Sequence, residues 1–257
     1  MRILVVSDIH ANWPALSAID EEYDVCLCLG DLVDYGPDPV SCVRWAMEHA
    51  TYSIRGNHDH GVAQGIRVKG ESGFRYLTGV SRPSMWEALG PDERRYLLQL
   101  PVTQRATLAG KDYLLVHATP RDPLDEYLLK DPEVWARRLA DTEADIVCVG
   151  HSHLQFNLQV GRTVVLNPGS VGLPRDGDPR AAYAIIEDNR IELKRIPYPV
   201  EETVSRIEAM PWPRRARDMT IASLRTGRLP GPPGPDSTDD PSTGRGSGEG
   251  RETRPGR

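Results

Sequence analysis

Two apolar runs joined by a short helical stretch constrain the fold of this chain more than any other feature. Residues 3–6 and 25–29 are continuous apolar segments, as expected for strands that are buried on both faces. Between them, Asn12 is placed to cap a helix that has Pro14 in its first turn. A strand, a helix and a second strand within about thirty residues predict a βαβ unit with parallel strands and a right-handed crossover.

The same alternation continues along the chain and predicts an α/β fold. Further strands are predicted at 52–54, 113–116, 146–149 and 164–166, with a hairpin formed by 181–186 and 191–196, and helices at 40–47, 132–139 and 200–210. Residues 61–110 differ in character and are predicted to be a small helical insertion that covers one side of the molecule. Its aromatic residues form either a lid that stacks on a ligand or a small local core: Phe74, Tyr76, Trp86 and Tyr96.

Composition narrows the class of protein and its partners. The 257 residues are 39% hydrophobic and 26% charged, enough for a substantial core, and we expect one domain over 1–228. Residues 229–257 are almost free of apolar side chains, which predicts a disordered tail. A net charge of −6 argues against a nucleic-acid polymer as partner.

The cellular setting is predicted from two further features. The first apolar run is too short for a signal peptide, and no stretch approaches the ~18 apolar residues of a membrane span. The four cysteines show no Cys-x-x-Cys pairing and are expected to be buried free thiols. These features favour a cytoplasmic protein that does not enter a membrane.

Each of five apolar runs ends in a residue of a type that binds metals. The residues are Asp8 and His10, Asp31, Asn57, His117, and His151 with His153. Strand ends converge at one edge of an open α/β sheet, so we expect these side chains to meet there. In extended chain, residues two apart face the same way, so Asp8-x-His10 and His151-x-His153 are each expected to aim two side chains into one cleft.

The ordered set of motifs resembles the calcineurin-like metallophosphoesterase superfamily over roughly residues 1–200. The motifs are Asp8-x-His10, Gly30-Asp31-x-x-Asp34, Gly56-Asn57-His58-Asp59, His117 and Gly150-His151-x-His153. Within that superfamily they are similar to small bacterial phosphodiesterases and the diadenosine-polyphosphatase-related group. The resemblance implies a four-layer α/β/β/α sandwich.

The resemblance also implies a dinuclear metal centre. Asp8, His10 and His153 would hold one ion, Asn57, His117 and His151 would hold the other, and Asp31 would bridge them. Imidazole, carboxylate and amide ligands suit divalent transition metals such as Mn, Fe, Zn, Co or Ni. On this resemblance, two such ions would activate a water nucleophile toward the phosphorus of a small phosphorylated substrate.

Outside the ligand set, the resemblance makes His58 the general acid, and we expect Asp59 to orient it. Arg175 is a candidate contact for a substrate phosphate, although an exposed loop arginine is an equal alternative. Asn12 is a candidate substrate contact or simply a helix cap.

Two other functions stay open from the sequence, a Ser/Thr protein phosphatase and a non-catalytic scaffold of the same fold. Protein phosphatases usually carry Asp-Arg-Gly and Gly-Asn-His-Glu, where this chain has Asp34-Tyr35-Gly36 and Asp59. A scaffold would be expected to have lost ligands, which this chain retains. The sequence does not predict an oligomeric state.

Overall fold

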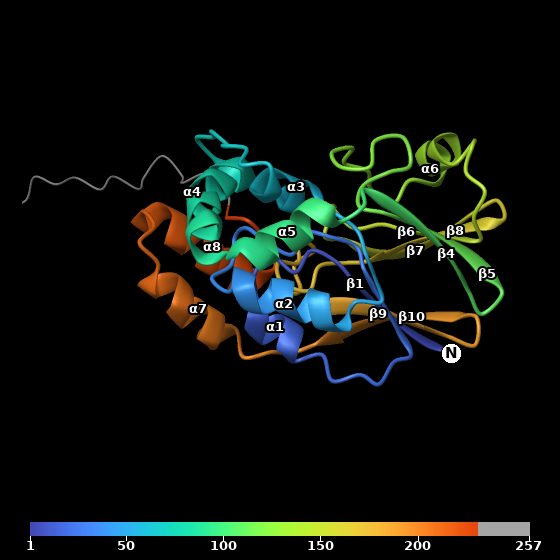
Figure 1. Cartoon of the computed structure of the whole chain (residues 1–257), viewed down its shortest axis with the longest axis horizontal. Coiled ribbons are helices and arrows are strands. Elements are labelled where there is room, and N and C mark those ends of the chain that lie inside the picture. The colour runs from blue at the N-terminus through green and yellow to red at the C-terminus, as the bar shows by residue number, and fades with distance from the viewer. Residues whose placement is uncertain (231–257) are drawn as a thin grey trace, which may run out of the picture.

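The computed structural model describes residues 1–230 and contains two five-stranded sheets packed face to face, with helices on both outer faces (Figure 1). The predicted four-layer α/β/β/α sandwich is thus confirmed. The predicted disorder of 229–257 lies, apart from its first two residues, outside the described part of the chain. Within 1–230, no helix combines the length and apolar character needed to cross a membrane.

The two sheets mix parallel and antiparallel strands. The first sheet has the order β10 (Arg190–Ile196), β9 (Ala181–Glu187), β1 (Arg2–Val6), β2 (Val25–Cys28) and β3 (Tyr52–Ser53). The second has the order β4 (Thr103–Leu108), β5 (Lys111–Val116), β6 (Ile146–Cys148), β8 (Thr163–Pro168) and β7 (Gln155–Val160). Strand β1 pairs parallel with β2, as the predicted βαβ unit requires, and antiparallel with β9.

Alternate side chains of the central strands enter different cores, which explains their continuous apolar runs. Leu4 and Val6 of β1 pack under the helices, whereas Ile3 and Val5 face the second sheet. The second sheet repeats this arrangement, because Leu115 faces the first sheet while its neighbours Leu114 and Val116 pack with the outer helix.

The helices divide between the two outer faces and one end of the sandwich. They are α1 (Trp13–Ser17), α2 (Pro39–His49), α3 (Asn57–Ala63), α4 (Gly73–Ala88), α5 (Pro91–Gln99), α6 (Pro132–Arg138), α7 (Val200–Ala209) and α8 (Arg214–Thr226). Helices α1 and α2 pack on the first sheet and α6 packs on the second. Helices α4, α7 and α8 share a separate core at one end that includes Leu77, Ile207 and Leu224.

Four elements were not predicted, namely α3, β4, β7 and α8, and β4 corrects the extent of the insertion. Its helical part ends at Gln99, and residues 103–108 form β4 rather than continuing the insertion. Strands β4 and β7 are the two edges of the second sheet, so their sequences are half polar and lack a continuous apolar run. Helix α8 buries mostly small or hydroxyl side chains, which gives a weak apolar pattern.

The aromatic residues of the insertion are chiefly a local core. Tyr76 packs against the core of α4, α7 and α8, and Trp86 and Tyr96 pack under the first sheet's helices. Phe74 also contacts the α4 core, but it additionally lines the cavity described below. The local-core alternative therefore holds for three of the four residues.

Candidate active site

The loops that follow β1 and β2 are joined by main-chain hydrogen bonds. The amides of Asp8, His10 and Ala11 donate to the carbonyls of Gly30, Asp31 and Leu32 at 2.9–3.0 Å. The segment after β3 approaches the loop after β2 equally closely, because a Cβ on Gly30, whose φ is +91°, would lie 2.4 Å from the amide nitrogen of Gly56. The glycine before Asp31 is therefore needed to bring two ligand loops together.

Five of the predicted ligands lie in left-handed backbone conformations, which corrects the expected extended spacing. The φ angles are 53° at Asp8, 47° at His10, 57° at Asp31, 62° at His151 and 59° at His153. The pairs spaced by two residues do converge, but they do so through tight turns instead of the alternation of a strand. Such backbone is unfavourable for side chains larger than glycine, and the surrounding hydrogen bonds hold it in place.

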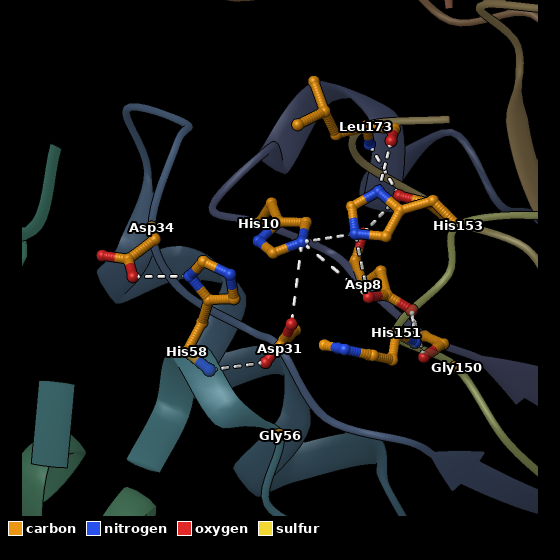
Figure 2. A network of polar contacts seen from close by, with 12 residues as sticks. Asp8, His10, Asp31, Asp34, Gly56, His58, Gly150, His151, His153 and Leu173 are labelled. Carbon is orange, nitrogen blue, oxygen red and sulfur yellow. Dashed lines mark hydrogen bonds and ion pairs between the residues drawn. The ribbon is translucent and has the colours of Figure 1, made fainter. Parts of the chain in front are cut away.

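The first cluster of side chains, which we name the buried group, consists of Asp8, His10 and His153. Their metal-binding atoms lie within 4.8 Å of one another, and each residue is at most 1% exposed. The Nδ1–H groups of His10 and His153 donate to the carbonyls of Val33 and Leu173 at 2.9 and 2.5 Å. Both Nε2 atoms are therefore unprotonated, and they lie 3.1 Å apart (Figure 2).

The second cluster, which we name the open group, consists of Asn57, His117 and His151. His117 is buried and donates its Nδ1–H to the carbonyl of Leu29 at 2.7 Å. His151 and Asn57 are only half-buried, and the Nδ1 of His151 contacts the Oδ1 of Asn57 at 3.2 Å. His117 and His151 each offer a metal-binding atom within 4.8 Å of one on Asp31.

Asp31 lies between the two groups, and Figure 2 shows its contacts with His10 and His58. Its Oδ2 is 3.2 Å from the Nε2 of His117 and 3.8 Å from the Nε2 of His10. Its Oδ1 accepts the main-chain N–H of His58 at 2.9 Å, which fixes the carboxylate. One carboxylate oxygen thus faces histidines of both groups.

The protonation of these side chains matches a cation site. Burial lowers the pKa of His10 well below its ordinary value and that of His151 to about 4, so both are neutral ligands near pH 7. Burial opposes a charge on His117 too, but the Asp31 carboxylate outweighs it and raises the His117 pKa to about 10. The carboxylates therefore attract positive charge into the cluster.

Two orphaned atoms support the same conclusion. Among the described residues, Asp8 Oδ1 and His117 Nε2 are buried without a hydrogen-bond partner. Asp8 Oδ1 faces the unprotonated Nε2 atoms of His10 and His153 at 3.8 and 3.1 Å, and such atoms repel one another unless a cation lies among them. The donor set of imidazole nitrogen, carboxylate oxygen and amide oxygen suits divalent transition metals.

The structure corrects the predicted partner of His58. The Nδ1–H of His58 donates to the Oδ2 of Asp34 at 2.7 Å (Figure 2). The carboxylate of Asp59 accepts no hydrogen bond from the His58 ring. Asp59 instead accepts main-chain N–H groups of Asp31, Leu32 and Gly56 at 2.7–3.0 Å. Helix α3 turns the Asp59 side chain back onto its own N-terminus, so Asp59 stabilises the ligand loop.

Of the two candidate substrate contacts, Arg175 lines the site and Asn12 is buried away from it. Asn12 is buried, caps α1 through the N–H of Ala15, and donates its amide to the carbonyl of Gly172 at 2.8 Å. Its polar atoms are satisfied by the protein, so the helix-cap alternative applies. Arg175 lines the site, with its guanidinium 3.7 Å above the centre of the Phe74 ring.

One cavity of about 490 Å³ is lined by residues of the insertion and by part of this site: Asp31, Asn57, His58, His151, His153 and Arg175. The lining residues that had not been singled out from the sequence include Tyr35, Thr78, Arg82 and Arg75. Asp34, behind His58, belongs to the Gly-Asp-x-x-Asp spacing, which was a usable signal. Arg82 carried no such signal, because it meets Asp34 only through the packing of α4.

Comparisons with known proteins define the family. Residues 1–190 match the model of the calcineurin-like phosphoesterase superfamily domain. The chain therefore belongs to the calcineurin-like metallophosphoesterases and is a phosphoester hydrolase, as the motifs predicted.

Three relatives illustrate the similarity. An uncharacterized protein, MJ0912, of Methanocaldococcus jannaschii is 30% identical over 80% of this chain and 91% of its own length. The phosphodiesterase YfcE of Escherichia coli is 24% identical over 74% of this chain and 89% of its own. The crystal structure of a metallophosphoesterase from Sphaerobacter thermophilus superposes with a TM-score of 0.73, at 29% identity, over 88% of this chain and 99% of that one.

Proposed function

We propose that this protein hydrolyses small phosphodiesters, phosphomonoesters or nucleotide polyphosphates with two divalent transition-metal ions, in the cytoplasm. The single observation that carries the proposal is the position of Asp31 between two histidine groups at the base of one cavity. The four cysteines are free and buried, in keeping with a reducing compartment.

The proposed ligand assignment follows the two groups. Asp8, His10 and His153 would hold one ion and Asn57, His117 and His151 the other, with Asp31 shared. When bound, the ions would supply Lewis-acid charge to the phosphoryl oxygens and lower the pKa of a water nucleophile toward ~7. The main-chain carbonyls behind three imidazoles hold their Nε2 atoms toward the site without rearrangement.

In this proposal His58 is the general acid. Asp34 accepts its Nδ1–H, which leaves Nε2 as the nitrogen that can carry a proton to the leaving oxygen. That nitrogen lies 3.3 Å from the hydroxyl of Tyr35, on a ring that lines the cavity. The N–H of His58 also holds Asp31, so the acid and the shared carboxylate keep a fixed separation.

Arg175 is proposed to bind a negatively charged part of the substrate. Its Nε is buried and has no hydrogen-bond partner among residues 1–230, and stacking on Phe74 holds the guanidinium flat against the cavity. Arg175→Ala should raise KM about tenfold with a smaller change in kcat, since a charged hydrogen bond of about 1.5 kcal/mol is lost. A fall confined to kcat would contradict a binding role.

The function is tested with purified protein supplemented with Mn²⁺. It should cleave bis-p-nitrophenyl phosphate, and His58→Ala should cripple that cleavage, whereas His49→Ala should leave it unchanged because His49 is an exposed residue of α2. Cyclic nucleotides, dinucleoside polyphosphates, phosphomonoesters and a phosphopeptide, each with several metals, would then identify the substrate class. Preference for the phosphopeptide would favour a protein phosphatase, and absence of cleavage with every metal would favour a scaffold.

A further inference from the structure

Arg82 of helix α4 places a guanidinium inside the protein, directly behind the proposed acid. Arg82 is 4% exposed and its carboxylate partner, Asp34, is fully buried. The Nε and Nη2 atoms of Arg82 donate to the Oδ2 of Asp34 at 3.0 and 2.5 Å, and Nη1 donates to the carbonyl of Ile66 at 3.2 Å. A Cβ on Gly61 would lie 2.1 Å from Nη1, so the guanidinium occupies a fitted slot.

The carboxylate oxygen that accepts from Arg82 is the same one that accepts from His58. Asp34 Oδ2 is 2.7 Å from the His58 Nδ1, and the His58 ring is turned toward Asp34 (Figure 2). A buried carboxylate that accepts two hydrogen bonds from one guanidinium keeps a fixed position. Arg82 therefore holds the Asp34 carboxylate in place, and that carboxylate sets the tautomer and the orientation of the His58 ring.

Helix α4 contacts this loop at more than one position. Residues 78, 81 and 82 lie on one face of the helix, three and four residues apart. Ser81 Oγ accepts the N–H of Tyr35 at 3.0 Å. Thr78 Oγ1 donates to the carbonyl of Phe74 at 2.9 Å and accepts the hydroxyl of Tyr35 at 3.0 Å. The insertion thus contacts the side chain of Asp34. It also contacts both the main chain and the side chain of Tyr35.

We infer that Arg82 is a positioning residue for the reaction, and that the helical insertion orients the proton donor as well as covering the site. This inference rests on the proposed role of His58 and adds a residue that acts through Asp34. Its effect should depend on the leaving group. A good leaving group such as p-nitrophenolate departs with little help from an acid, whereas phenolate or an alkoxide needs the proton.

The first test compares esters of one phosphoryl group with p-nitrophenol and with phenol, using the Mn²⁺-loaded protein. Arg82→Gln and Arg82→Lys should lower kcat for the phenyl ester by about tenfold to a hundredfold and for the p-nitrophenyl ester by less than about threefold. KM and metal content should stay the same. Arg44→Gln is the matched control, because Arg44 pairs with Glu93 of the insertion at 2.7 Å and contacts none of the site.

A double variant shows whether Arg82 acts through Asp34. Adding Arg82→Gln to Asp34→Asn should produce no further loss with the phenyl ester. Independent losses that multiply, or equal losses for both esters, would overturn the inference and leave Arg82 as a stabilising residue. Cleavage of neither ester by the unaltered protein would instead contradict the proposed function.

A second measurement does not depend on activity. In the metal-free protein, the hydrogen-bonded Nδ1–H of His58 should give a protected downfield proton resonance that is assigned by its loss in His58→Gln. The resonance should disappear in Arg82→Gln, or in the more conservative Arg82→Lys if the first variant does not fold, and persist in Arg44→Gln. Its persistence in a folded Arg82 variant would show that Asp34 orients His58 without Arg82.

Discussion

The buried group and the open group contain similar side chains but are supported differently. In the buried group, both imidazoles are held by main-chain carbonyls and all three residues are shielded from solvent. In the open group, only His117 is held in this way, while His151 and Asn57 contact each other on the cavity wall. Preorganised ligands lose less freedom on binding, so the buried group should hold its ion more tightly.

This difference separates two tasks within one site. Asn57 and His151 of the open group lie on the cavity wall with His58 and Arg175, so we expect them to adjust to an arriving phosphoryl group. The buried group has His153 alone on the cavity wall and is otherwise covered by the loops after β1 and β8. We expect the ion of the buried group to stay bound and the ion of the open group to exchange with solution.

The largest loss of activity is expected from Asp31→Asn. In this variant neither group should retain its ion, so their difference in metal affinity should disappear. The variant weakens the shared ligand, so both ions should be lost, and the several kcal/mol of charge stabilisation they supply corresponds to about a thousandfold in kcat. Metal content per chain after gel filtration measures this, with the exposed Asp92→Asn as control. Loss of one ion alone would demote Asp31 to an ordinary ligand.

Two matched variants should show in which group the loss of one ligand is harder to offset with excess metal. They are His153→Gln and His151→Gln. Both variants should lower kcat/KM by about tenfold to a hundredfold at equimolar metal, the range seen when metal sites are weakened. Excess Mn²⁺ should restore His151→Gln more completely, because the remaining ligand His117 is still held by the carbonyl of Leu29. Equal restoration of the two variants would remove the proposed distinction.

A chelator should separate the groups in the unaltered protein. Titration with a moderately strong chelator should remove metal in two phases, with activity lost in the first phase and about half of the metal retained. The physical reason is the half-exposed position of His151 and Asn57 compared with the full burial of His10. A single phase that releases both ions together would mean that Asp31 couples the groups too strongly for either to be emptied alone.

The smallest effect is expected far from both groups, at Glu21. Lys194, Tyr183 and Arg2 contact its carboxylate and, against burial, lower the Glu21 pKa to about 2 from an ordinary 4.5. This carboxylate therefore adds stability above pH 4.5 that is lost as the pH falls toward 2. Glu21→Gln should cost on the order of 1 kcal/mol at pH 7, since these ion pairs are partly exposed to water.

Urea unfolding of metal-free protein at pH 7, 4.5 and 3 measures this effect. The free-energy difference between Glu21→Gln and the unaltered chain should shrink from the first pH to the last, while activity at pH 7 stays unchanged. A difference that stays constant with pH would mean that the ion pairs of Glu21 do not survive in solution.

The sequence contained most of the fold because the strands at the centre of each sheet are buried on both sides. Their unbroken apolar runs located β1, β2, β5, β6 and β8, and the ligand-type residues at their ends are the ones that the structure brings together. The edge strands β4 and β7 carry half-polar sequences, which the same pattern cannot identify.

The support behind His58 was harder to predict than the ligands. Asp59 is its neighbour in sequence, yet the helical turn of α3 points that carboxylate toward the main chain. Asp34 reaches His58 from 24 residues away, and Arg82 reaches Asp34 from a further 48 along the chain. The Asp34 spacing was a usable signal, whereas the Arg82 contact depends on how α4 packs, which no local spacing encodes.

The left-handed backbone at five ligand positions also bears on how such a chain can change over evolutionary time. Asp8, His10, Asp31, His151 and His153 occupy conformations that glycine adopts more easily, at a saving of about 1 kcal/mol per residue. In a gene copy that is no longer selected for hydrolysis, replacing these ligands by glycine would therefore raise the free energy of unfolding. The first ligands to be lost would be those in the left-handed turns. A descendant that kept the sandwich only to bind a partner would then be more stable to unfolding than the enzyme.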